Sequence, residues 1–161
     1  MLLGAVTASF TRPADTTTYS SGDLVANSTT AGSVTPLSFS LFRAPQGQTI
    51  LMRVRIAKTG TSTTNATFRV HLYQASPTVA NGDNGAWSSD KAGDYLGNID
   101  VGSMFAFTDG AAGFGSAAAG AEMRVRLAAG ATIYGLIEAR GAYTPANAEV
   151  FTVTLETLDG Y

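Results

Sequence analysis

The feature that most restricts the fold of this chain is an alternation of apolar and polar residues that recurs in several short segments. Phe68, Val70 and Leu72, for example, alternate with Arg69 and His71. Successive side chains of a β-strand point to opposite faces of its sheet, so a period of two predicts strands that bury one face in a core. The clear segments are 37–41, 50–56, 68–73, 123–127 and 151–156.

Weaker strand patterns bring the expected number of strands to eight or nine. They occupy residues 5–11, 23–27, 95–101 and 133–137. The last of these is apolar on both faces, which predicts a central strand that is covered on both sides. Within 50–56, the alternation places Met52 among the core residues. No amphipathic helix pattern separates these segments, so the fold class expected is all-β.

The connections between the strands indicate how they are arranged. We expect one domain, residues 1–161, built as a jelly-roll-like antiparallel β-sandwich, because two long connections at 74–94 and 106–121 interrupt the hairpins. An immunoglobulin-like sandwich is the alternative. Segment 110–120 consists largely of Gly and Ala and is predicted to be a loop. Residues 1–20 are expected to form an N-terminal arm that reaches a neighbour, or else an ordinary edge strand.

Composition and charge exclude several classes of protein. Charged residues make up 14% of the chain and hydrophobic residues 45%, which suits a sandwich with many tight turns. A formal net charge of −2 gives no general attraction to nucleic acid or to anionic membranes, so neither is an expected partner. The absence of cysteine removes disulfides and thiolate chemistry.

The N-terminal residues do not resemble a targeting signal. The apolar run at 1–6 has no basic residues and is interrupted by Thr7 and Ser9. No apolar run elsewhere approaches the roughly 20 residues that cross a bilayer as a helix. We expect a soluble protein, or one that leaves its cell by a route other than a signal peptide.

The titratable residues do not form a recognisable catalytic or metal site. His71 is the only histidine, and a lone histidine on a strand predicts a polar surface or interface residue rather than a triad or a metal ligand. The carboxylates Asp83, Asp90, Asp94 and Asp100 could offer oxygen ligands to calcium, but their spacing does not match the helix-loop-helix calcium motif. We therefore expect no enzyme activity, metal or cofactor.

Trp87 is the only tryptophan and lies in the long polar connection 74–94. An exposed aromatic ring among Asn, Asp and Gly is typical of a sugar-binding loop, with Asp83 and Tyr95 as further glycan contacts. The alternative is that the ring folds back over the sandwich, because burying a side chain of this size stabilises a fold by a few kcal/mol.

Five arginines lie at polar positions of the predicted strands: Arg53, Arg55, Arg69, Arg124 and Arg126. Arginine is enriched in protein interfaces, where its planar group pairs with carboxylates. The set therefore indicates either an interface with another protein surface, or cross-strand salt bridges within one sheet. The two interpretations stay open at this point.

The sequence also resembles a group of small virion proteins of tailed bacteriophages, and the likeness covers nearly the whole chain. The stretches that carry it include SFTRPADTT (9–17), GDLVANS (22–28), KTGTS (58–62), FRVHL (68–72), PTVANGDNGAW (77–87), YGLIEAR (134–140) and EVFTVTLE (149–156). Proteins of this kind are commonly encoded near the major capsid protein. The resemblance implies a virion component, with a head decoration or cement protein as the expected assignment, and it transfers no catalytic residues.

The expected function that follows is binding to the outer surface of an assembled phage head. The partners would be the major capsid protein and further copies of this chain, arranged as a homotrimer. An N-terminal arm would bring Phe10 and Arg12 to the same interface as the five arginines. The alternatives are a carbohydrate-binding module, or a structural protein associated with the tail or a fibre.

Overall fold

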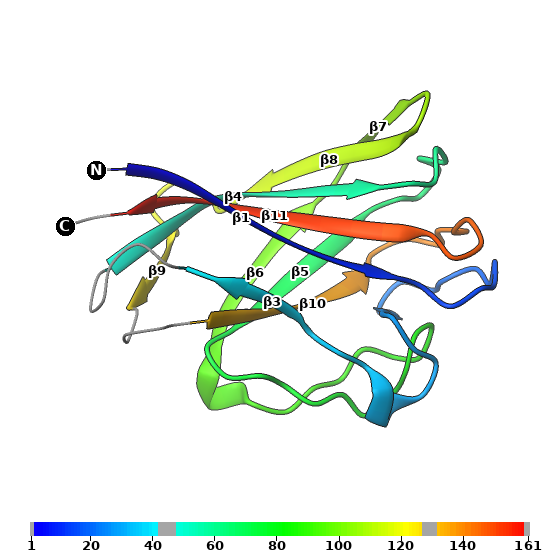
Figure 1. Ribbon diagram of the computed structural model, residues 1–161, viewed down its shortest axis with the longest axis horizontal. Helices are drawn as coiled ribbons and strands as arrows, with labels where there is room; N and C mark the ends of the chain where they lie inside the picture. Colours follow the sequence, from blue (N-terminus) through cyan, green and yellow to red (C-terminus); the bar gives the residue numbers. More distant parts are fainter. Residues whose placement is uncertain (1, 42–47, 127–131, 160–161) are drawn as a thin grey trace.

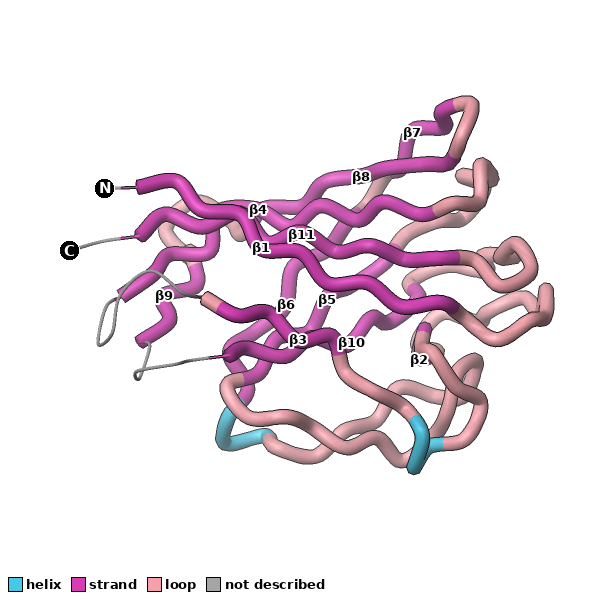
Figure 2. The backbone as a smooth tube through the Cα atoms, viewed as in Figure 1, coloured by secondary structure: helices cyan, strands magenta, loops and turns pink. Residues whose placement is uncertain are grey.

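Nearly all of the regular structure is β-strand. The computed structural model describes residues 2–41, 48–126 and 132–159, which form two antiparallel sheets packed against each other (Figures 1 and 2). Two single-turn 3₁₀ helices, η1 (Ala31–Ser33) and η2 (Ala92–Asp94), lie in the connections. The all-β sandwich expected from the alternation is confirmed.

Eleven strands form from the described residues. The six-stranded sheet has the order β1 (Leu2–Thr11), β11 (Val150–Asp159), β4 (Gln48–Lys58), β8 (Gly110–Ser116) and β7 (Met104–Phe107), with β9 (Met123–Arg126) also paired to β4. The five-stranded sheet has the order β2 (Leu24–Val25), β10 (Thr132–Ala139), β5 (Phe68–Tyr73) and β6 (Tyr95–Val101), with β3 (Leu37–Ser40) also paired to β10. The strand expected at 123–127 is described only as far as Arg126, because residue 127 lies outside the described residues.

The strand order is that of a jelly roll. If β2 and β3 count as one position and β7, β8 and β9 as another, the eight positions follow the orders 1-8-3-6 and 2-7-4-5 in the two sheets. Each sheet thus draws strands from both halves of the chain, as two interleaved Greek keys require. The count exceeds the expected eight or nine because two of these positions are divided into shorter strands.

The main core lies between the sheets and is built from the inward side chains of both. Val54 and Ile56 of β4 and Val153 of β11 are fully buried there. The alternation fails at one point: a β-bulge in the β4–β11 pairing makes Leu51 the buried residue and leaves Met52 42% exposed. The extra residue of a bulge shifts the pattern by one, so the inward position expected for Met52 is wrong.

The second long connection, expected at 106–121, is a hairpin rather than a loop. Strands β7 and β8 pair through Met104↔Gly113 and Phe107↔Gly110. A Cβ at Gly113 would lie 2.3 Å from the carbonyl oxygen of Ser103, and one at Gly115 would lie 2.1 Å from that of Asp100. Gly115 allows β8 to approach β6 of the opposite sheet, and Gly113 allows it to approach the connection between β6 and β7. The small residues therefore reflect close packing and not a mobile loop.

The N-terminal residues form an edge strand and not a free arm. β1 pairs with β11 along its whole length, from Leu2↔Asp159 to Thr11↔Val150 (Figure 1). After the strand, the ring of Tyr19 is 1% exposed and belongs to the main core. The arm proposed for residues 1–20 is therefore wrong, and its alternative, an edge strand, is what the structure shows.

The connection 74–94 covers part of the outer side of the five-stranded sheet (Figure 2). A second apolar cluster forms beneath it from Leu24, Ala26, Tyr73 and Leu136, with Trp87 packed against them. This cover explains why most residues of β5 and β10 are buried on both faces of their sheet. It also positions the aromatic pocket that is described below.

Candidate functional site

Arg12 and Asp83, expected at an interface and in a glycan site, instead form a buried ion pair with each other. Their side chains are fully buried, and Nη2 of Arg12 lies 2.8 Å from Oδ2 of Asp83. The other carboxylate oxygen accepts hydrogen bonds from the Tyr19 hydroxyl and the Ala26 amide, each at 2.7 Å. Arg12 also donates to the Tyr19 hydroxyl. Neither residue is available to a partner, so both assignments are wrong.

A second buried ion pair lies next to the first. Nζ of Lys58 is 3.1 Å from Glu149, and the Tyr143 hydroxyl donates to the same carboxylate. Burial lowers the pKa of Lys58, although Glu149 opposes this effect. The rings of Tyr19 and Tyr143 stack with centroids 6.5 Å apart, so the two networks are in contact. Together they tie the loops at one end of the sandwich to the core.

Four of the five predicted interface arginines share one surface, the solvent-facing side of the six-stranded sheet, which we call the outer sheet face. Arg53 and Arg55 lie there on β4, and Arg124 and Arg126 lie there on β9 opposite Ile50 and Gln48. All four arginines are exposed. Arg69, in contrast, lies on β5 in the other sheet and pairs with Asp100 at 2.6 Å. The structure therefore gathers four arginines and separates the fifth.

The outer sheet face also carries three exposed phenylalanines. Phe114 pairs with Arg55 across β8 and β4, and Phe105 pairs with Ala112, two residues before Phe114. Cross-strand partners share a face, so these residues lie on the same side of the sheet. Phe105 is 65%, Phe107 58% and Phe114 46% exposed. Adjacent exposed rings of this kind mark a surface that favours a partner.

The charges on the outer sheet face are not balanced. Arg53 pairs with Glu156 through two hydrogen bonds of 2.9 Å and lies over the Phe114 ring at 4.5 Å. Arg55 reaches only the Thr154 hydroxyl, at 3.3 Å. Within the described part of the chain, Arg55, Arg124 and Arg126 make no ion pair. The face is thus basic and apolar, although the whole chain is slightly acidic.

An aromatic pocket lies on the opposite sheet, beneath the connection 74–94. Its volume is about 320 Å³, and it is lined by His71, Tyr73, Trp87, Ser89, Asp90, Ala92 and Tyr95. The Trp87 ring stacks on the His71 ring at 4.0 Å, and the Tyr73 and Tyr95 rings lie 5.2 Å apart. Trp87 and Tyr95, two of the three residues expected as glycan contacts, thus line one pocket, while Asp83 is buried elsewhere. The alternative for Trp87 also holds in part, because the ring packs against the second cluster.

His71 is a buried residue that orients the pocket, and not the surface residue that was expected. It is 4% exposed; its Nε2 lies 2.7 Å from Glu138 and its Nδ1 lies 2.9 Å from the Tyr95 hydroxyl. Burial lowers the pKa of His71, although hydrogen bonding to Glu138 opposes this effect. The neutral ring then donates from Nε2 to Glu138 and accepts at Nδ1 from Tyr95. Both ring nitrogens of His71 are thus occupied, one by Glu138 and the other by Tyr95.

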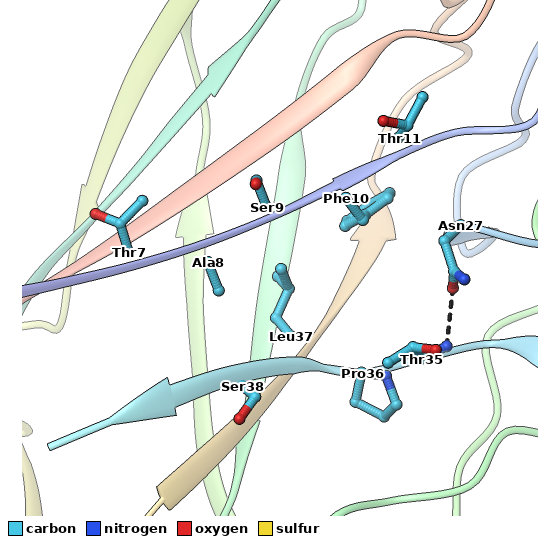
Figure 3. Close-up of a pocket in the computed structure, with 10 residues that line it drawn as sticks. All are labelled: Thr7, Ala8, Ser9, Phe10, Thr11, Asn27, Thr35, Pro36, Leu37 and Ser38. Atoms are coloured by element: carbon cyan, nitrogen blue, oxygen red, sulfur yellow. Dashed lines mark hydrogen bonds between the residues drawn. The ribbon is translucent and has the colours of Figure 1, made fainter.

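A third concave surface is the groove of about 650 Å³ between β1 and β3, at the open edge of the two sheets (Figure 3). Phe10 lines it and packs inward, with its ring stacked on Phe151 at 5.8 Å. The other lining residues are mostly small or hydroxyl-bearing, and the Thr35 amide donates to Asn27 at 2.8 Å. Phe10 therefore supports the core and is separate from the arginines with which it was grouped.

Among 2–41, 48–126 and 132–159, no group of three or more His, Asp or Glu side chains could hold a metal ion. No helix in these same ranges is long and apolar enough to cross a membrane.

Comparisons with known proteins add little. No protein-family model matches the chain, and no curated protein sequence matches it. A solved structure, a family two carbohydrate esterase from Cellvibrio japonicus, is similar at 11% identity over 98% of this chain, with a TM-score of 0.20. This chain spans 35% of that structure's chain. A score this low carries no argument about fold or function.

Two parts of these surfaces were missed by the sequence analysis. The apolar run Met104, Phe105, Ala106 and Phe107 ahead of the turn residues Asp109 and Gly110 is a hairpin signal, and the spacing of two residues predicts that both rings lie on one face of the strand. His71 and Tyr73 share the polar face of their strand, so their spacing could have placed both near a covering loop. Their contact with Trp87 depends on how the connection 74–94 packs on the sheet, so the sequence alone could not predict it.

Proposed function

We propose that this protein is a decoration, or cement, protein of a tailed-bacteriophage head, which binds the outer surface of the assembled shell through its outer sheet face. The resemblance to small virion proteins supports the assignment of this chain to the virion. The contacts on the outer sheet face support binding to a protein surface. The protein would be made in the host cytoplasm and act without catalysis or a cofactor.

The observation that carries this proposal is the set of unpaired arginines beside exposed phenylalanines. Arg55 and Phe114 are cross-strand partners, and Arg55 has no carboxylate partner among the described residues. Apolar rings beside arginine are typical of the residues that dominate protein interfaces. The positive charge of these arginines is complementary to acidic groups on a partner. The proposed contact is therefore an acidic and partly apolar patch on the capsid shell.

Such binding would stabilise the head without any chemical step. A protein that binds the assembled shell but not separated subunits adds its binding free energy to the stability of the shell. We further propose that three copies act together as a homotrimer, because several weak contacts made by one assembly bind more tightly than each contact alone.

Retention on heads tests the proposal directly. Heads assembled from the major capsid protein of the same genome would be mixed with this chain and sedimented at low and high salt. We expect Arg55→Ala and Arg124→Ala to weaken retention, because each leaves an acidic group unpaired at the contact. The loss should be about 2 kcal/mol, or about thirty-fold in affinity.

The control is Arg69→Ala, which removes an arginine from the opposite sheet and should leave retention unchanged. Unfolding of each variant in urea would confirm that the isolated protein remains folded. Equal retention of all three variants would overturn the proposed face. Binding to purified tails or fibres instead of heads would assign the protein to that part of the virion.

A further inference from the structure

The aromatic pocket has a construction that stability alone does not explain. The Nε1 atom of Trp87 is buried without a hydrogen-bond partner in the described part of the chain. An unpaired buried donor costs free energy, which a phenylalanine covering His71 would avoid. Trp87 lies at the pocket despite the cost of its unpaired Nε1 donor. We infer that its large ring has a role besides packing.

The backbone at the rim of the pocket is also in an unfavourable conformation. Lys91 has φ +67°, in the left-handed region that residues other than Gly, Asn and Asp rarely occupy. This conformation lies between Asp90 and Ala92, both of which line the pocket. A strained backbone conformation of this kind is stable only where the contacts around it fix it in place. Such conformations are concentrated at binding and catalytic sites.

The polar groups of the pocket are held in place before any ligand binds. The carboxylate of Asp90 accepts hydrogen bonds from the amide and hydroxyl of Thr78, both at 2.8 Å, and these lower its pKa so that it is ionised at neutral pH. The Tyr95 hydroxyl accepts from Asn98 at 2.9 Å and donates to His71. A carboxylate has about four acceptor positions and a hydroxyl two, so both groups keep free acceptors.

From these groups we propose that the pocket binds a saccharide, one pyranose unit at a time. The C–H groups on one side of a sugar ring carry partial positive charge and pack against the negative face of an aromatic ring such as Trp87 or Tyr95. The sugar hydroxyls donate to Asp90 and to the Tyr95 oxygen. A volume of about 320 Å³ lies at the lower end of the range for small-molecule sites.

The chemistry of the pocket favours a neutral, hydroxyl-rich ligand over the alternatives. Two cations act near the pocket: Lys91, whose Nζ lies 3.8 Å from Asp90, and Arg69, which interacts electrostatically with His71 and Tyr95 but pairs with Asp100 at 2.6 Å. Each already has a carboxylate partner, so an anionic ligand would gain little from them. A quaternary ammonium group would gain from the rings and from the charge of Asp90, but it has no hydrogen-bond donor and would leave the remaining acceptor position of the Tyr95 oxygen without a partner. Sugar binding here is independent of shell binding, because the pocket and the outer sheet face lie on opposite sheets.

Fluorescence of Trp87 gives a direct test, because it is the only tryptophan in the chain. The full chain would be titrated with glucose, galactose, rhamnose, N-acetylglucosamine and their short oligomers, with choline chloride as the competing class. We expect a saturable change with at least one saccharide. Tyr95→Ala and Asp90→Asn should each raise the dissociation constant at least tenfold, because each removes a ring or an acceptor from the pocket.

Two further variants separate loss of the site from loss of the fold. Tyr95→Phe keeps the ring and removes the hydroxyl, so it should weaken binding less than Tyr95→Ala. Phe114→Ala, on the outer sheet face, should leave sugar binding unchanged. The inference is overturned by the absence of a saturable response to every saccharide, by a response to choline alone, or by equal affinity in all variants. Failure of head retention with normal sugar binding would count against the proposed function alone.

Discussion

At the scale of single residues, Asp83 joins segments that are far apart in the sequence. Its carboxylate bonds to Arg12, to the Tyr19 hydroxyl and to the Ala26 amide. Burial raises the pKa of Asp83, whereas these three partners favour its charged form. The charge is retained because Arg12 faces it, and a buried charge without a partner is costly.

The first prediction concerns this pair. Asp83→Asn keeps the shape of the side chain but removes the fully buried partner of Arg12, which is left with only the longer contact to the partly exposed Asp15 at 3.4 Å. The free energy of unfolding should therefore fall by about 3 kcal/mol, at the lower end of the range for a broken buried pair. Urea denaturation of the purified protein measures this loss. The matched control is Glu156→Gln, which breaks the partly exposed pair with Arg53 and should cost less than about 1 kcal/mol. Equal losses for the two variants would show that the buried network is not important for stability.

The second prediction concerns pH and His71. The ordinary pKa of the group is 6.5, and burial lowers it in the folded protein. Below pH 6.5 the unfolded chain therefore binds more protons than the folded protein, and the free energy of unfolding falls as the pH falls toward the lowered pKa. The charged and titratable groups that act on the ring are Glu138, Arg69, Asp100 and Tyr95.

Since His71 is the only histidine, a change in stability between pH 7.5 and 5.5 should come mainly from this residue. We expect His71→Gln to remove most of that change, because glutamine can still donate to Glu138 but does not titrate. Urea denaturation at several pH values gives the two slopes. A variant with the same slope as the original protein would show that His71 titrates normally.

At the scale of elements, strand β8 depends on glycine for its close approach to the opposite sheet. A Cβ at Gly115 would lie 2.1 Å from a backbone oxygen of Asp100, on β6, which cannot move aside as a flexible side chain could. The inward side of β8 therefore has no room for a side chain at this position.

The third prediction follows from this contact. Gly115→Ala should lower the free energy of unfolding by about 1–3 kcal/mol, as expected when an extra methyl group is forced into a packed interior. Gly102, between β6 and β7, has open space around its Cβ position and provides the control. Gly102→Ala should be neutral or slightly stabilising. If thermal unfolding shows the same midpoint for both variants, the two sheets are not as closely packed at β8 as described.

At the scale of the whole molecule, the two sheets present different surfaces. The five-stranded sheet is partly covered by the connection 74–94, while the outer sheet face exposes Phe105, Phe107 and Phe114 on one hairpin. This hairpin lies at the edge of the molecule (Figure 1). An apolar patch of this kind is costly for a monomer in water.

The fourth prediction is that the purified protein forms a symmetric oligomer, with the trimer as the proposed state, by contact between these hairpins. Light scattering across the micromolar range measures its mass. Phe105→Ser together with Phe107→Ser should shift the mass toward the monomer without unfolding the chain, because both rings are exposed. A monomer at all concentrations in the original protein would contradict this prediction.

The sequence could predict strands wherever the alternation of side chains is strong. It placed the inward residues of β5 and β11 correctly, because a half-buried strand repeats every two residues. The prediction from the alternation failed at Met52, because a bulge changes the register of the strand without any local signal. It also failed at β8, because the glycines and alanines there allow close packing against a strand from another part of the chain. The sequence also predicted that the arginines of β4 and β9 point outward, since a pattern of outward residues is local, but it grouped Arg69 with them although β5 belongs to the other sheet.

The sequence by itself therefore determined the fold class and the residue types available to a binding site. Only the tertiary structure decided that Arg12 and Asp83 bury each other's charge, that Arg69 lies on the sheet opposite the other arginines, and that Trp87 meets His71. Each of these is a contact between residues far apart in the chain. Such contacts depend on how the sheets and loops pack, and no periodicity along the sequence encodes which residues will meet.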